Sequence, residues 1–362
     1  MRPLTIVALV CSAASFVLAA DYGRVSMTAV APGVYLFTTE PYGDVGLGGN
    51  AVAIVTDEGV VLFDTSGTPA SGAAIVAGLR TVTDKPVRYV INSHWHWDHW
   101  GGNQTIAAAF PAVTFLSHEK NRDLMMNVAV AWNAPGLERD LPQFLDARRR
   151  QLAVAEGAHA AGDNDAELAA KRELLAADES FLAEKRSVTY TFPTEVFSDT
   201  MTLALGGREI RVLHARAITP GDTYVYLPKE QVLVAGDILV HPIPFAVGGS
   251  YPQDWMATLQ KLAALDVDAI VPGHGGIERD RSYLHRNIAL FQHVIADVKD
   301  AKARGLPIEQ ARKTMLDRAA VYAADLGLAD SQLPAFKGYF LEVFVNRAYH
   351  ELEAPLGDNP VS

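Results

Sequence analysis

The sequence predicts an α/β fold in which short apolar strands alternate with helices. Apolar runs of strand length, rich in valine and isoleucine, are separated by turn residues and by helical stretches. One of these runs, Val87–Asn92, leads directly into His94-Trp95-His96-Trp97-Asp98-His99. Because α/β proteins bind ligands at the carboxyl ends of their strands, this six-residue loop is the first candidate for a functional site.

The elements fall into three zones. In the first zone, residues 21–134, two strands are joined by the turn Asp57-Glu58-Gly59, a typical hairpin signal. The elements predicted there are strands at residues 34–38, 51–56, 60–64 and 87–92 and helices at 71–82 and 102–110.

The second zone, residues 135–186, lacks any strand pattern and is rich in alanine, leucine and charged residues. It predicts two helices, 141–161 and 165–185, broken at Gly162-Asp163-Asn164, where Asn164 and Glu167 fit a capping box. We treat residues 136–186 as a helical insertion. Either it borders a site, or it is a solvated hairpin without a role in one.

The third zone returns to strands and ends in helices. The predicted strands are 209–215, 223–227, 231–235 and 267–271, and the predicted helices are 255–265, 279–304, 308–326 and 333–352. We therefore expect a main domain at residues 21–290, which contains the insertion, and a C-terminal helical extension at 291–362.

Residues 1–20 resemble a secretory signal peptide. A basic start, Met1-Arg2-Pro3, precedes an apolar run at 4–18 and small residues before Asp21. The alternative is an uncleaved membrane anchor, although the run is shorter than the about 20 residues that span a bilayer. The single cysteine, Cys11, lies in this segment, so we expect a mature chain without disulfides or thiolate ligands, without stable membrane insertion, and periplasmic or secreted.

Composition limits the class of partner. The chain has 362 residues, 49% of them hydrophobic, which is enough for a large core. Its net charge of −11 argues against nucleic acid, which requires a basic surface. We expect a small-molecule substrate, and nothing in the sequence sets the oligomeric state.

The six-residue loop has the composition of a metal site. Neutral imidazole and carboxylate are ligands that Zn²⁺ accepts, and His94, His96, Asp98 and His99 supply four of them at very short spacing. Two more such groups follow apolar strands, namely Asp237 after Val234-Ala235-Gly236 and His274 within a glycine-rich loop. Each is unspecific alone, but together with the loop they predict one metal site.

These motifs resemble the metallo-β-lactamase superfamily of hydrolases, over about residues 34–274. The resemblance implies a four-layer αββα sandwich with two metals at one edge. It also implies a supporting acid at Asp64, a bridging carboxylate at Asp237 and a final ligand at His274. Family members cleave esters, thioesters, lactones, lactams or phosphoesters with water.

One position departs from the family pattern. A further histidine is expected in a His-Thr-x-Gly-Asp run, and here the matching stretch is Ala217-Ile218-Thr219-Pro220-Gly221-Asp222. Isoleucine cannot bind a metal, so the first site keeps only His94 and His96. Asp237 could supply its third ligand as well as bridge.

The resemblance leaves the second site complete, with Asp98, His99 and His274. The protein could then hold one Zn²⁺ there, or two with the first site filled, or iron, because two histidines and a carboxylate also form an iron triad. We favour two zinc ions. His241, four residues after Asp237, is the remaining histidine that could touch metal or substrate.

We therefore expect an exported zinc-dependent hydrolase that uses a metal-bound hydroxide to cleave an ester, lactone, thioester or lactam bond. Asp98 and Asp237 are the expected catalytic carboxylates. Trp95, Trp97 and Trp100 either face the cleft, which favours a small and partly apolar substrate, or all pack beneath it. The alternatives are a periplasmic β-lactamase and a non-catalytic metal-binding or sensing protein whose first site has decayed at Ile218.

Overall fold

The computed structural model describes residues 15–19, 24–41, 48–158 and 165–358. Its first sheet has eight strands in chain order. The strands are β1 (Ser15–Ala19), β2 (Arg24–Ala31), β3 (Val34–Thr39), β4 (Ala51–Val55), β5 (Val60–Phe63), β6 (Val87–Asn92), β7 (Thr114–His118) and β8 (Glu195–Phe197). Pairing is antiparallel from β1 to β5 and parallel from β5 to β8.

The second sheet has five strands, in the order β13-β12-β11-β10-β9. They are β9 (Thr200–Leu205), β10 (Arg208–Ala215), β11 (Asp222–Leu227), β12 (Val232–Val240) and β13 (Ala269–His274). Only β12 and β13 run parallel. Parallel strands end at the same edge of their sheet, and this holds for β12 and β13 in the second sheet and for β5 and β6 in the first. The candidate ligands lie at these two edges.

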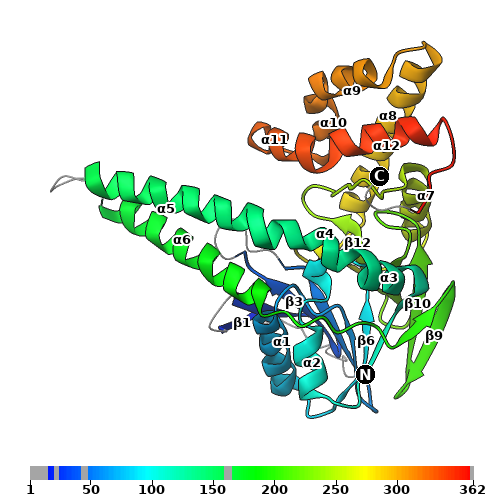
Figure 1. Cartoon of the computed structure of the whole chain (residues 1–362). Coiled ribbons are helices and arrows are strands. Elements are labelled where there is room, and N and C mark those ends of the chain that lie inside the picture. Colours follow the sequence, from blue (N-terminus) through cyan, green and yellow to red (C-terminus); the bar gives the residue numbers. More distant parts are fainter. Residues whose placement is uncertain (1–14, 20–23, 42–47, 159–164, 359–362) are drawn as a thin grey trace, which may run out of the picture.

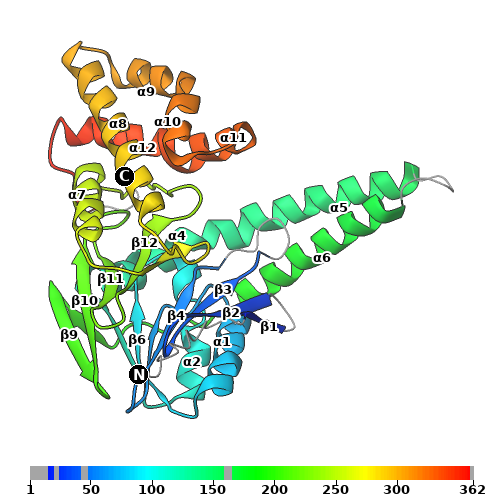
Figure 2. The same cartoon turned by 180° about the vertical axis from the view of Figure 1, so that it is seen from behind.

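Three apolar clusters hold the layers together. One lies between the sheets, where residues such as Val52 of the first sheet pack with Val225 of the second. Another joins the first sheet to α1 (Pro69–Val82) and α2 (Asn103–Ala109). The third joins the second sheet to α7 (Pro252–Ala263) and the C-terminal helices. The result is the expected αββα sandwich, visible in Figures 1 and 2.

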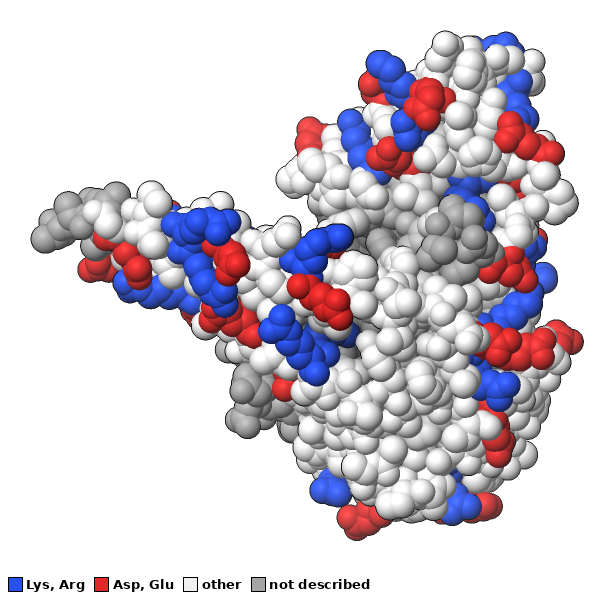
Figure 3. Space-filling model, in the orientation of Figure 1, with Lys and Arg blue, Asp and Glu red and all other residues white. Residues whose placement is uncertain are grey.

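The helical insertion predicted at residues 136–186 continues a helical segment that begins at Glu119, and its two longest helices project from the body (Figure 1). Its elements are α3 (Glu119–Leu124), η2 (Met125–Ala129), α4 (Val130–Pro135), η3 (Gly136–Asp140), α5 (Leu141–Ala158) and α6 (Asp165–Arg186). Basic and acidic side chains mix along the hairpin of α5 and α6 (Figure 3), as expected for a solvated face. The predicted break at 162–164, with the cap at Asn164, lies outside the described residues.

The C-terminal helices stack above the second sheet (Figure 2). They are α8 (Ser282–Ala303), α9 (Ile308–Asp317), α10 (Ala319–Leu326), η4 (Asp330–Gln332), α11 (Leu333–Phe336), η5 (Lys337–Leu341) and α12 (Glu342–Glu351). The boundary that we placed at residue 290 falls inside α8. This helix packs on α7 and also on α9, α10 and α12, so it connects the two parts that we expected to be separate.

Of the proposed signal peptide, residues 15–19 form β1, which pairs with β2. Residues 1–14 and 20 lie outside the described part of the chain. Among the described helices, none is both long enough and apolar enough to cross a bilayer.

Candidate metal centre

The loop after β6 is held in place by Asp64 at the end of β5. The Asp64 carboxylate accepts a hydrogen bond from the backbone N–H of Ser93 at 2.7 Å and contacts Nδ1 of His99 at 2.9 Å. Asp64 is buried and adopts a positive φ of 60°. Because the Nδ1 proton of His99 points to Asp64, Nε2 of His99 is free to face the site.

Asp237 and His274 reach the same site from the parallel pair β12 and β13. The approach is so close that a Cβ atom at Gly273 would lie 1.9 Å from Oδ1 of Asp237. A Cβ atom at Gly49 would likewise lie 2.4 Å from the ring of His99. Glycine at both positions is therefore a steric requirement of the site.

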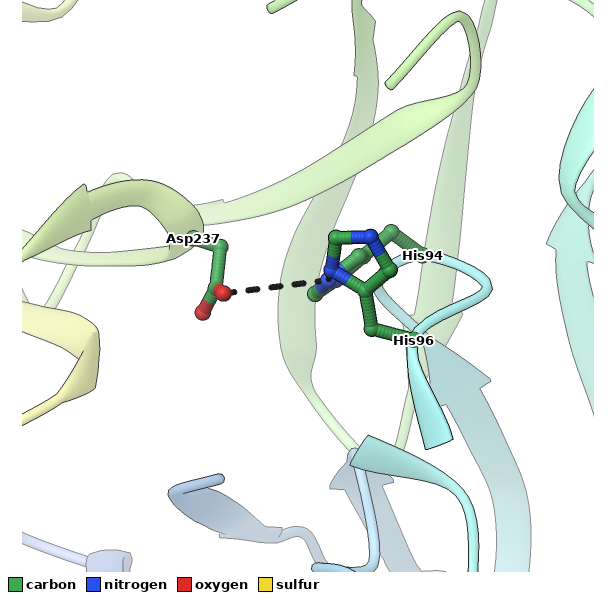
Figure 4. A group of neighbouring side chains, drawn as sticks. All are labelled: His94, His96 and Asp237. Atoms are coloured by element: carbon green, nitrogen blue, oxygen red, sulfur yellow. Dashed lines mark hydrogen bonds and ion pairs between the residues drawn. The ribbon is translucent and has the colours of Figure 1, made fainter. Parts of the chain in front are cut away.

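The first group consists of His94, His96 and Asp237 (Figure 4). Nε2 of His94 lies 2.8 Å from Nδ1 of His96 and 3.7 Å from Oδ2 of Asp237. Nδ1 of His94 is engaged by the hydroxyl of Ser93 at 3.0 Å, so Nε2 is the atom that faces the other two side chains.

The second group consists of Asp98, His99 and His274. Oδ2 of Asp98 lies 3.1 Å from Nε2 of His274 and 3.5 Å from Nε2 of His99. Oδ1 of Asp237 lies 3.2 Å from that same His99 nitrogen and 3.6 Å from that of His274. The two oxygens of Asp237 thus face different groups, which is the arrangement of a bridging carboxylate.

The polar atoms of this centre fit bound cations. Within the described part of the chain, Nε2 of His96 is buried without a hydrogen-bond partner, and Nε2 of His99 and Oδ1 of Asp237 have none apart from their own 3.2 Å contact. Each such atom costs about 1–3 kcal/mol when it is left unsatisfied. A metal ion would satisfy them, and the mixture of imidazoles and carboxylates is one that zinc accepts.

The charge states of the histidines differ. Burial lowers the pKa of His96 to about 4 and the pKa of His94 well below its ordinary value, so both stay neutral, as metal ligands must. Burial also opposes protonation of His99, but Asp237, Asp98 and Asp64 outweigh it and raise the pKa of His99 well above its ordinary value. Without metal, a proton on His99 therefore partly balances the carboxylates.

Ile218 contributes no ligand atom, as its chemistry requires. It is fully buried in the apolar cluster beneath the C-terminal helices, together with Ile238 and Leu239. Its loop is shaped by Asp222, whose carboxylate accepts hydrogen bonds from the N–H groups of Ala217 and Thr219 and from the hydroxyl of Thr219.

Neither His214 nor His241 belongs to a ligand group. His214 stacks on His118, with ring centroids 3.9 Å apart, and its Nε2 lies 3.0 Å from the carbonyl oxygen of Pro220. His241 is in neither ligand group, but it lines the cavity over the centre.

The cavity over the centre has a volume of about 470 Å³. His96, Asp98, Asp237 and His274 form its polar part. The remaining lining includes an apolar wall, defined here as Trp132, Val240, Ile243, Phe245 and Tyr339. Of the three tryptophans near the ligands, Trp97 faces this cavity, whereas Trp95 and Trp100 are buried beneath it.

Sequence reasoning missed Trp132 and Tyr339. They come from α4 and η5, more than 200 residues apart in the chain. Both are exposed large hydrophobic side chains, at 46% and 58%, which is a signal visible only in the folded chain.

Comparison with known proteins agrees with this geometry. The model of the metallo-β-lactamase superfamily matches residues 44–274. The linear primary-alkylsulfatase of Pseudomonas sp. (strain ATCC 19151) is 25% identical over 267 residues, which cover 69% of this chain and 46% of the alkylsulfatase.

Two solved structures share the fold. A metallo-β-lactamase from Pontibacter korlensis superposes with a TM-score of 0.51 at 19% identity, covering 74% of this chain and 99% of its own. The stereoselective inverting sec-alkylsulfatase Pisa1 from Pseudomonas sp. superposes with a TM-score of 0.58 at 18% identity, covering 92% of this chain and 50% of its own. This chain spans about half the length of each alkylsulfatase. It belongs to the metallo-β-lactamase superfamily, and it has the fold and the paired His/Asp groups of a metal-dependent hydrolase of that superfamily.

Proposed function

We propose that this protein is a zinc-dependent hydrolase that cleaves an ester, lactone, thioester or lactam bond in a small, partly apolar substrate. One observation carries the proposal. The same cavity combines the two His/Asp groups with an apolar wall. A substrate can therefore place its reacting centre at the ligands and its apolar part against Trp132, Phe245 and Tyr339.

We assign two zinc ions to the two groups, one to His94, His96 and Asp237 and one to Asp98, His99 and His274. When bound, the ions would supply a water molecule with a pKa of about 7 and would polarise the substrate oxygen. Asp237 would hold both sites together, because its two oxygens face different groups. Asp64 would keep His99 in the tautomer that binds metal.

The role of Asp98 follows from its position. Its carboxylate lies in the cavity lining and contacts His274. It can accept the proton of the attacking water and return that proton to the leaving group.

A second candidate substrate class is a sulfate ester with an alkyl chain. It is favoured by the two alkylsulfatases among the relatives. Its apolar chain fits the same wall, and its single negative charge suits a centre of cations.

Metal analysis and a substrate panel test both candidates. We expect two zinc ions per chain in protein purified without chelators, with little iron. The panel contains 4-nitrophenyl octanoate, an acyl lactone, an acyl thioester, a cephalosporin and octyl sulfate. Cleavage of octyl sulfate alone would favour the second candidate, and cleavage of the cephalosporin alone a β-lactamase. Metal binding without any turnover would instead indicate a metal-binding or sensing protein.

Ile218→His tests whether the first group is complete. If Asp237 serves as its third ligand, the added imidazole leaves the zinc content unchanged at two. A rise from one zinc to two in the variant would mean that the natural first site is compromised.

We also propose export. The basic start and apolar run of residues 1–20 support it. Cell fractionation with N-terminal sequencing is the test, and we expect a periplasmic or secreted chain that begins at Asp21. A cytoplasmic chain that still begins at Met1 would contradict export.

A further inference from the structure

A second cavity, of about 350 Å³, lies beside the metal cavity and is built mainly from the helical insertion. We call it the lysine pocket and define it by Trp97, Asn133, Leu141, Phe144, Phe181 and Lys185. Trp97 also lines the metal cavity, and in the chain it stands between His96 and Asp98. The two cavities therefore share one indole side chain.

Lys185 is the unusual member of this pocket. The residue is only 8% exposed, and its Nζ lies 3.6 Å from the ring centroid of Trp97. Among the described residues, its Nζ contacts this aromatic ring and makes no ion pair or hydrogen bond. Burial lowers the pKa of Lys185 to about 7, against a weaker opposing effect of Asp98. The side chain has lost most of its contact with water and its Nζ faces an aromatic ring, so an anionic ligand would stabilise the ammonium.

Asn133 adds a second donor without a partner. Its Nδ2 is buried and makes no hydrogen bond in the described structure. Both polar groups thus lack an acceptor, so a ligand that satisfies them must carry acceptor oxygens.

The rest of the lining sets the shape and charge of that ligand. Asp140 also lines the pocket, but both of its oxygens are engaged by Arg139, the shorter contact being 2.7 Å. Lys185 therefore supplies the unbalanced charge. Leu141, Phe144 and Phe181 offer apolar surface that suits a short hydrocarbon chain.

We propose that the lysine pocket binds a small monoanionic amphiphile, with its head on Lys185 and Asn133 and its chain against Leu141, Phe144 and Phe181. The head group can be a carboxylate or a sulfate, because both present acceptor oxygens with one negative charge. The site is separate from the ligands of the metal centre. It stands independently of the proposed hydrolysis.

Titration calorimetry of the zinc-loaded protein with sodium octanoate, sodium octyl sulfate and 1-octanol tests this site. We expect one equivalent of each anion to bind at the lysine pocket, in addition to any octyl sulfate held at the metal centre, and octanol to bind there at least tenfold more weakly. The ratio of the two anion affinities decides which head group the site prefers. Equal binding of octanol would overturn the proposal, because it would show that the head group is not recognised.

Lys185→Met keeps the length of the side chain and removes its charge. We expect it to weaken binding of both anions at least tenfold, whereas Lys171→Met, an exposed position on the same helix, leaves it unchanged. A second variant, Asn133→Leu, should weaken anion binding severalfold and decides the matter if Lys185→Met does not fold.

Repeating the titration after treatment with a chelator separates the pocket from the metal centre. We expect anion binding to persist. If it disappears with the metal and is unaffected by Lys185→Met, the anions bind at the metal centre and the lysine pocket proposal is wrong.

Discussion

The metal ligands and the apolar wall face the same cavity, yet the chain builds them in different ways. The ligands stand on the loop after β6 and on the parallel strands β12 and β13, and all of them except His274 are buried. The wall draws Trp132 and Tyr339 from helices, where they remain about half exposed. Because the ligands are closely packed, substituting them costs stability and geometry. Substituting a partly exposed side chain changes the free energy of unfolding little. Substitutions should therefore affect the ligand edge strongly and the wall weakly.

The largest effect is expected for Asp98→Ala. Loss of this carboxylate removes a metal ligand and the proposed proton acceptor, so kcat should fall by about 10³-fold or more. Steady-state kinetics and the thermal unfolding midpoint are the measurements. If the variant folds and keeps a tenth of the wild-type activity, Asp98 is not the catalytic carboxylate.

The next effect concerns the loop that carries Ile218. Asp222→Ala removes the acceptor of three buried hydrogen bonds, from Ala217 at 3.1 Å and from Thr219 at 2.8 and 2.7 Å. We expect the free energy of unfolding to fall by about 2–4 kcal/mol in denaturant titrations. Asp57→Ala, with a side chain that is 92% exposed, is the matched control and should change little.

Asp222 also predicts a pH dependence. Burial raises its pKa to about 7, so between about pH 4 and pH 7 the folded chain holds a proton that the unfolded chain has lost. The stability that this group contributes therefore falls as pH rises through that window. Unfolding midpoints of wild type and Asp222→Asn should show a smaller decline in the variant, and identical pH profiles would contradict the assignment.

A smaller effect is expected for Asp64→Asn, which keeps the shape of the side chain and removes its charge. Because Asp64 orients His99 from behind, metal affinity should fall by about 10- to 100-fold. Competition with a chromogenic chelator measures it. Unchanged affinity would show that the carboxylate charge does not support the metal.

The smallest effect belongs to the wall. Trp132→Ala should raise KM by about fivefold, because it removes roughly 1 kcal/mol of apolar contact, and should leave kcat unchanged. Val154→Ala on the projecting hairpin is the control, since Val154 is 73% exposed and distant in sequence from the cavity lining. A large fall in kcat for Trp132→Ala would show that the wall takes part in the chemical step, which contradicts the expected difference between the ligands and the wall.

Much of the fold was predictable because strands and helices leave local patterns. The apolar runs that became β4, β5, β11 and β12 are compact and almost wholly buried. Other strands were missed, among them β7, although it is mostly buried. In β9 exposed and half-buried residues alternate, and β2 and β8 have mixed burial, so tertiary pairing rather than local hydropathy decides them. The single helix expected at 308–326 is divided at Arg318, whose backbone leaves the helical region.

For the site, sequence alone determined the superfamily and a set of six candidate ligands, because spacing at strand ends is a local property. The tertiary structure decided how these side chains are oriented and which distant segments meet at the site, neither of which follows from the spacing of residues in the sequence. It placed the two oxygens of Asp237 toward different groups, because β12 and β13 run parallel to a common edge. It also brought Trp132 and Tyr339 over the ligands and Lys185 behind Trp97, since these contacts join segments that are far apart in the chain.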